Sequence, residues 1–166
     1  MTRLVVPLVV LAAAYALFFG YTLTTYAALP PKVASHFDGH GRPDGWMSRT
    51  ADTEIMSAVA LFVPGLVIAF MGGASRIPIS FINLPHRDYW LAPERRKAAL
   101  AALRCYAIWF AALNVLFLTG AQFLIVHANL PAPHTLDMTR FTTGVIAYLV
   151  FTAIWTLLLL RRFSKV

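Results

Sequence analysis

The stretch "LVVPLVVLAAAYALFFGYTLTTYAA", residues 4–28, decides the fold because it has no charged side chain over 25 positions. A helix needs about 20 apolar residues to cross a hydrocarbon core about 30 Å thick. Three further apolar runs follow along the chain, at residues 55–71, 105–126 and 141–160. The sequence therefore predicts an all-α integral membrane protein, one domain over residues 1–166, with four transmembrane helices at about residues 4–28, 52–72, 98–127 and 139–161.

The composition indicates that lipid is the solvent of this chain. Hydrophobic residues make up 59% of it, charged residues 13%, and the mean hydropathy is +0.68. A water-soluble helical protein would have amphipathic helices, whereas these runs are apolar on every face. A cleaved secretory signal is an alternative for the first run, because Arg3 precedes it. The apolar core of such a signal has about 7 to 15 residues, so the longer first run favours a retained helix.

Lysine and arginine are distributed unequally between the two sides of the predicted bundle. The terminal segments and the loop after the second helix hold ten: Arg3, Arg76, Arg87, Arg95, Arg96, Lys97, Arg104, Arg161, Arg162 and Lys165. The other side holds four: Lys32, Arg42, Arg49 and Arg140. Cytoplasmic loops carry the excess of these residues, so both termini are expected in the cytoplasm. The net charge of +7 is then a topology signal and an attraction to anionic headgroups, and no nucleic-acid partner is expected.

The predicted outer loop, residues 29–51, is polar and contains the turn-forming stretches Asp38-Gly39 and Pro43-Asp44-Gly45. Loops of this length are usually functional or disordered. Its aromatic residues argue for order, and Phe37 and Trp46 are suited to anchor it at the membrane interface. We expect a compact, ordered Ω-like lid built from turns.

The second predicted helix begins with a capping signal. Ser48 or Thr50 can serve as its N-cap. Asp52 and Glu54 fall in its first turn, where carboxylates complement the positive end of the helix dipole, so neither acid requires a chemical role.

Two features lie deeper in the predicted helices. Asn114 and Gln122 are near one face of the third helix, and buried amides in a bilayer normally hold helices together. Pro64-Gly65, near the middle of the second helix, indicates a kink or a discontinuous helix that lines a site.

Two polar motifs carry a resemblance to a known family. The first is "LPPKVASHFDGHGRPDGWMSR", residues 29–49, and the second is "INLPHRDYWLAPERR", residues 82–96. They resemble a bacterial membrane domain of unknown function found at the N-terminus of SdpI-type immunity and signalling proteins. The matching residues of the first motif are Leu29, Pro30, His36, Phe37, Gly41, Pro43, Asp44, Trp46, Ser48 and Arg49; those of the second are Asn83, Pro85, Tyr89, Trp90, Pro93, Glu94, Arg95 and Arg96.

The resemblance implies a multi-pass protein of the bacterial inner (plasma) membrane. It implies that both motifs take part in ligand or partner recognition, and it transfers no biochemical activity. SdpI-type immunity proteins carry further membrane helices after this domain, whereas one more span follows the third helix here.

The outer loop also contains residue types that bind metals and catalyse hydrolysis. His36, Asp38 and His40 offer imidazole and carboxylate ligands on a glycine-rich backbone, which makes a metal site a minor alternative. Ser35 joins them to supply the residue types of a hydrolase, but the sequence has no nucleophile elbow and no HExxH motif. We expect neither an enzyme with catalytic residues nor a cofactor.

Three functions remain open from the sequence. The first is a non-enzymatic ligand-sensing or immunity-type binder, in which the outer loop recognises a peptide or small ligand and the cytoplasmic motif contacts a partner. The second is an accessory subunit of a larger membrane complex. The third is a small transporter or metal-handling protein, against which the scarcity of intramembrane charge argues. The expected partners are the lipid bilayer and a membrane protein or peptide.

Overall fold

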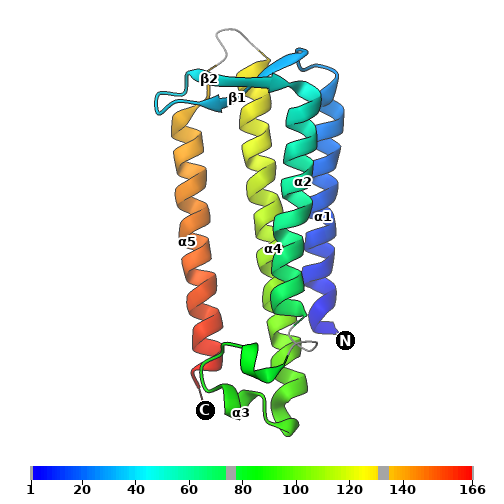
Figure 1. The fold of residues 1–166 in the computed structure, drawn as a ribbon, viewed down its shortest axis with the longest axis vertical. Helices are drawn as coiled ribbons and strands as arrows, with labels where there is room; N and C mark the ends of the chain where they lie inside the picture. Colours follow the sequence, from blue (N-terminus) through cyan, green and yellow to red (C-terminus); the bar gives the residue numbers. More distant parts are fainter. Residues whose placement is uncertain (1, 74–77, 131–134, 166) are drawn as a thin grey trace.

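The computed structural model describes residues 2–73, 78–130 and 135–165, arranged as a tall bundle (Figure 1). Its long helices are α1 (Thr2–Tyr26), α2 (Arg49–Val67), α4 (Pro93–Asn129) and α5 (Met138–Phe163), and the π-helical η1 (Ile68–Gly72) continues α2. All four are long and apolar enough to span a membrane, which confirms the predicted number of spanning helices. Arg76, from the predicted cytoplasmic set, lies outside the described residues.

The observed helix ends differ from the predicted ones where capping residues decide them. α4 begins at Pro93 rather than at about residue 98, because proline suits the first helical position and Glu94 follows in the first turn. α2 begins at Arg49 because Ser48 is its N-cap, whose hydroxyl accepts a hydrogen bond of 3.1 Å from the backbone N–H of Ala51.

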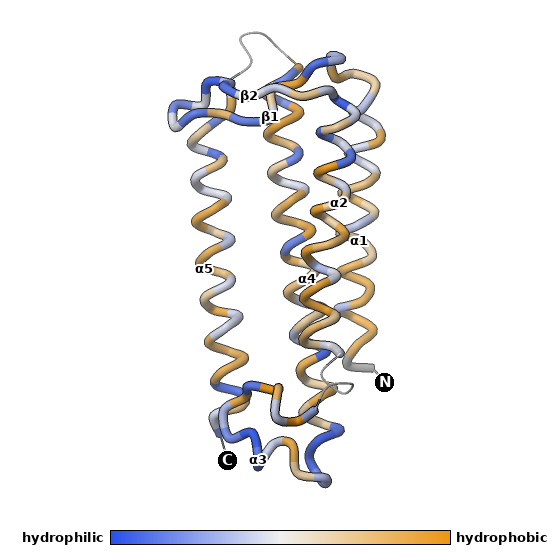
Figure 2. Tube along the Cα trace, in the orientation of Figure 1, coloured by the Kyte–Doolittle hydropathy of each residue, from blue (hydrophilic) through white to orange (hydrophobic). Residues whose placement is uncertain are grey.

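Helix α4 forms the centre of the bundle and contacts α1, α2 and α5. Its small residues Ala111 and Ala112 let α1 and α2 approach closely, and Phe18 of α1 is fully buried in this core. Most other side chains of the helices are apolar and face outward. Figure 2 shows this pattern as orange helices with polar segments gathered at the two ends of the bundle.

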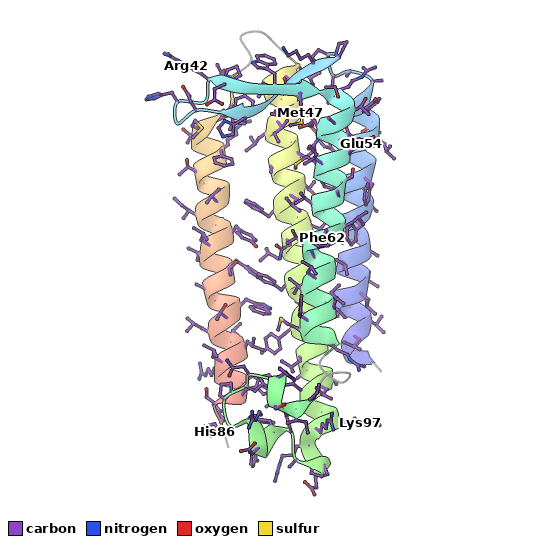
Figure 3. All side chains as sticks on the ribbon, viewed as in Figure 1. Arg42, Met47, Glu54, Phe62, His86 and Lys97 are labelled. Atoms are coloured by element: carbon purple, nitrogen blue, oxygen red, sulfur yellow. The ribbon has the colours of Figure 1, made fainter. Side chains whose placement is uncertain are left out.

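Helix α5 contacts only α4 among the long helices, and Phe163 is its one buried residue among those described. Side chains occupy the space between the two ribbons (Figure 3). Aromatic rings form much of this contact: Phe110 lies 4.6 Å from Trp155 and Phe117 lies 4.4 Å from Tyr148, measured between ring centroids. Tyr148 also donates a hydrogen bond of 3.0 Å to Asn114, which therefore joins two helices as expected.

The predicted turn-built lid is instead a β-hairpin. Strands β1 (Lys32–Phe37) and β2 (Pro43–Ser48) pair antiparallel across one end of the bundle (Figure 1). The opposite end carries the short helices η3 (Ile79–Phe81) and α3 (Arg87–Trp90). The N-terminal end of α1 and the C-terminal end of α5 lie there too. Both polar motifs therefore lie at the ends of the helices, on opposite sides of the bundle.

Candidate functional site

Asn129, at the end of α4, fixes the hairpin to the bundle. Its side-chain oxygen accepts a hydrogen bond of 2.7 Å from the backbone N–H of Ala34, and its amide donates one of 2.9 Å to the carbonyl of the same residue. The amide thus pairs with the free edge of β1 as a neighbouring strand would. Val33 and Leu29 are buried beside it against Val126 of α4. Sequence reasoning missed Asn129, because a polar residue at a helix end is ordinary.

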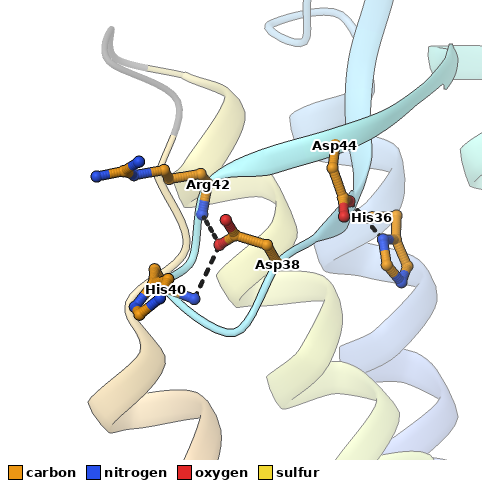
Figure 4. A network of polar contacts seen from close by, with 5 residues as sticks. All are labelled: His36, Asp38, His40, Arg42 and Asp44. Atoms are coloured by element: carbon orange, nitrogen blue, oxygen red, sulfur yellow. Dashed lines mark hydrogen bonds and ion pairs between the residues drawn. The ribbon is translucent and has the colours of Figure 1, made fainter.

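The tip of the hairpin is held by Asp38 (Figure 4). Its carboxylate accepts hydrogen bonds of 2.8 Å from the backbone N–H groups of both Arg42 and His40. The hydrogen bond from the Arg42 backbone, assisted by that from His40, lowers the pKa of Asp38 below its ordinary value. Asp38 therefore acts as the internal cap of this turn.

Gly41 completes the tip with a positive φ of 78°, a conformation that glycine adopts without strain. A Cβ at this position would also collide with the carbonyl oxygen of Leu136. The carbonyl of Gly41 accepts a hydrogen bond of 2.9 Å from the backbone N–H of Leu136, in the segment before α5. The tip is therefore joined to the segment that leads into α5.

His36 and Asp44 form a hydrogen-bonded pair between the two strands (Figure 4). Gly45 lies opposite His36, and a Cβ there would come within 2.8 Å of the His36 Cβ, so glycine makes room for the imidazole. Trp46, two residues after Asp44 on β2, has an exposed fraction of 42%. Its suggested role as an interfacial anchor fits that exposure and stays a prediction.

The suggested metal ligands His36, Asp38 and His40 do not converge. The Asp38 carboxylate is bonded to the backbone of the turn, and His36 is bonded to Asp44. Within residues 2–73, 78–130 and 135–165, no group of three or more His, Cys, Asp or Glu side chains is placed to hold a metal ion.

Arg49, the last residue of the first motif, closes the base of the hairpin. Its guanidinium donates a hydrogen bond of 3.0 Å to the carbonyl of Leu29 and lies 4.8 Å from the centroid of the Tyr26 ring. Its backbone N–H donates to the carbonyl of Pro31. The motif's conformation is thus set by its own polar residues together with Asn129 of α4.

A pocket lies between the hairpin, α4 and α5 and has a volume of about 240 Å³. Ser35, His36, Phe37 and Asp38 form its hairpin wall. It shares Ala121, Leu124 and Phe141 with a larger groove of about 520 Å³ that continues between α4 and α5 toward the middle of the bundle. We call the two together the hairpin groove.

The larger part of the hairpin groove is almost entirely apolar. Its side walls include Phe117 and Phe151, and Arg140 lies at its outer end. Gly120 and Gly144 also line it, and a Cβ at either position would meet nothing within 4 Å. The groove is therefore open at these glycines and combines apolar walls with a polar outer end.

The second motif fastens the other end of α5. The indole N–H of Trp90 donates a hydrogen bond of 2.7 Å to the carbonyl of Phe163, and the two rings meet edge to face at 5.4 Å. Tyr89 packs against Trp90, and the Arg95 guanidinium lies 4.0 Å from the Tyr89 ring centroid. Trp90 thus caps the last turn of α5.

The remaining residues of the second motif are spread out. Asn83 is exposed and lines a separate small pocket beside Phe81, while Pro85 lies in the turn before α3. Glu94 is in the first turn of α4, and Arg96 lines the side of that turn with Pro93. The structure therefore does not gather the second motif into one pocket.

Comparison with known proteins gives one match. Residues 4–68 match the family model described as a domain of unknown function (DUF1648). The match covers α1, the hairpin and α2, which includes the first motif, and leaves out the second motif, α4 and α5. It supports the predicted relation to a family of unknown function, whereas the likeness to SdpI-type proteins stays a prediction. No curated protein and no solved structure matches this chain significantly.

Proposed function

We propose that this protein is a non-enzymatic membrane receptor that binds an amphiphile, with an apolar chain between α4 and α5 and a polar group under the hairpin. The observation that carries the proposal is that two adjoining cavities share the walls Ala121, Leu124 and Phe141. One cavity is apolar and is lined by Phe117 and Phe151, and the other has His36 and Asp38 in its lining. Ligand sites are commonly apolar cavities of about 300–1,000 Å³ with a few convergent polar groups.

The lining of the groove favours a lipid-like chain. Its larger part is almost entirely apolar, and the polar side chains Ser35, His36 and Asp38 lie at the hairpin end. An extended acyl or isoprenoid chain fits this lining, and the polar outer end suits its headgroup.

The attachments of α5 provide a route from the groove to the other end of the molecule. At the outer end, Leu136 is bonded to Gly41 of the hairpin, and at the inner end Phe163 is bonded to Trp90. Between them α5 rests on α4 largely through rings such as Trp155 and Tyr148. A ligand that separates α4 from α5 would shift the Phe163 end against the second motif, where a partner could detect the change.

The proposal also includes the orientation of the protein in the membrane and the membrane in which it resides. The excess of lysine and arginine at the end that holds α3 supports an N-in, C-in orientation, with the hairpin outside. The likeness of both motifs to the N-terminal domain of SdpI-type proteins supports a bacterial inner membrane and a sensing or immunity-type role.

The test compares lipid retention by native mass spectrometry after release from nanodiscs of phosphatidylethanolamine and phosphatidylglycerol. Gly120→Leu and Gly144→Leu fill the groove, whereas Gly20→Leu adds the same side chain on α1, where a Cβ also meets nothing within 4 Å. We expect the wild type and Gly20→Leu to retain one lipid, and the groove variants to retain it at least tenfold less often. Equal retention in all four proteins would contradict the proposal.

A second comparison tests the polar end. Asp38→Asn and His36→Ala leave the apolar walls intact, so they should change the ratio of the two retained headgroups without abolishing retention. An unchanged headgroup ratio would show that the hairpin is not part of the binding site.

A further inference from the structure

We propose that Asp52, Gln122 and Thr22 form a buried binding site for one monovalent cation, a proton or a sodium ion. The three residues come from α2, α4 and α1, and their exposed fractions are 3%, 1% and 3%. This site is separate from the hairpin groove, which lies on the α5 side of α4.

Three contacts place these residues at one level of the bundle. The Gln122 side chain lies beside the Asp52 carboxyl group. The ring of Tyr21, next to Thr22, lies 5.8 Å from the ring of Phe123, next to Gln122.

The third contact joins the outer ends of α1 and α2. The hydroxyls of Tyr26 and Thr50 are 3.0 Å apart, so Thr22 and Asp52 each lie within about one turn of that contact on their own helices. The cluster therefore lies just beneath the hairpin.

One side-chain oxygen of each of the three residues lacks a hydrogen-bond partner among the described residues. Thr22 Oγ1, Asp52 Oδ2 and Gln122 Oε1 are all buried and accept or donate no hydrogen bond among the described residues. Leaving one buried polar group unsatisfied costs about 1–3 kcal/mol, and more for a charged group. Three such oxygens from three helices at one level, one of them from a carboxyl group, are suited to hold a cation between them.

The charge balance specifies a single positive charge. Asp52 is the cluster's one carboxylate, and no salt bridge reaches it within the described part of the chain. Arg49, one turn away, is directed to the carbonyl of Leu29 and the ring of Tyr26. A divalent ion would leave an excess charge in a region where ionised groups are strongly disfavoured, whereas a proton or a sodium ion neutralises the carboxylate.

The sequence alone gave Asp52 a different role. An acidic residue in the first turn of a helix can be explained by its interaction with the helix dipole, but that explanation applies to a side chain exposed to solvent. Its neighbour Glu54 is exposed and fits that description. Asp52 is buried because it faces α4, where it meets Gln122.

Two measurements on the full chain in mild detergent test the site. The first follows the thermal unfolding midpoint as sodium chloride replaces choline chloride at constant ionic strength. The second is infrared difference spectroscopy, in which Asp52→Asn identifies the band of the Asp52 carboxyl group. Glu54→Gln is the matched control, because it removes an exposed acid two positions along the same helix.

A sodium site predicts a midpoint that rises with sodium in the wild type and in Glu54→Gln, with at least a tenfold weaker response in Asp52→Asn and in Thr22→Val. The Thr22→Val variant keeps the shape of the side chain, so it serves if Asp52→Asn folds poorly. A proton site predicts no sodium response and a protonated carboxyl band near neutral pH that disappears in Asp52→Asn. An ionised Asp52 carboxylate that does not respond to sodium would overturn the proposal.

Discussion

The contact between Asn129 and the hairpin leads to a prediction that can be worked out quantitatively. Asn129→Ala removes both hydrogen bonds to Ala34, a residue with no exposed surface. The backbone N–H and carbonyl of Ala34 would then be buried without partners, at about 1–3 kcal/mol each. We therefore expect the hairpin to open at least about 2 kcal/mol more easily, which corresponds to a loss of amide protection of about 30-fold.

Hydrogen exchange read by mass spectrometry measures this directly on peptides that cover residues 29–49. Asn114→Ala is the control, because Asn114 is a buried asparagine of the same helix that bonds to Phe110 and Tyr148 instead of the hairpin. It should leave hairpin protection unchanged. Hairpin exchange that is the same in Asn129→Ala and the wild type would refute the idea that this amide holds β1 to the bundle.

Three further predictions concern the hairpin tip and the C-terminal end of α5. Gly41→Ala should destabilise the hairpin by about 1–2 kcal/mol or more, because it places a side chain at a φ of 78° and against Leu136. Trypsin should then cut faster at Arg42, whereas the control Gly39→Ala, with open space around its Cβ, should not change the cleavage rate. The hydrogen bond from the Arg42 backbone N–H is the largest cause of the lowered pKa of Asp38 in the folded protein. The Asp38 carboxylate therefore stabilises the turn fully above its unfolded-state pKa of about 3.9, and this stabilisation is lost as the pH falls through the lower folded-state pKa. NMR titration of the His40 and Arg42 amides should show that midpoint, Asp38→Asn should abolish it, and a midpoint at or above 3.9 would contradict the assignment. Trp90→Phe keeps an aromatic ring but loses the 2.7 Å hydrogen bond to Phe163, so the free energy of unfolding should fall by about 0.5–1.5 kcal/mol in thermal melts. The same change at the exposed Trp109 is the control, and equal melting of the two variants would argue against a capping role for Trp90.

The parts of the structure that follow from local sequence could be predicted. The four helices are visible as apolar runs because a membrane span is a property of about 20 consecutive residues. Ser48 was expected as a possible N-cap of α2 and is the cap, because capping depends on the residue itself and its immediate neighbours. The start of α4 at Pro93 was missed by about five residues.

The parts that depend on distant residues could not be predicted. The strands of the hairpin are six residues each, and β1 is held partly by Asn129, which lies 95 positions from Ala34. The burial of Asp52 depends on Gln122 in another helix, and the role of Trp90 depends on the last turn of α5. Single-sequence reasoning identified the two motifs but not the side chains that attach them to the bundle.

The proposed binding of a lipid-like chain between α4 and α5 under the hairpin can be tested in the membrane itself. Photo-crosslinking in vesicles would use a phospholipid that carries a diazirine on its acyl chain, followed by peptide mapping. We expect adducts on Phe117 and Phe151 at least tenfold above those on Leu61 and Phe62, which are exposed on α2 away from the groove. Labelling of equal strength on both sets would mean that the groove takes up no more lipid than any outer face of the bundle, and the proposed binding site would be wrong.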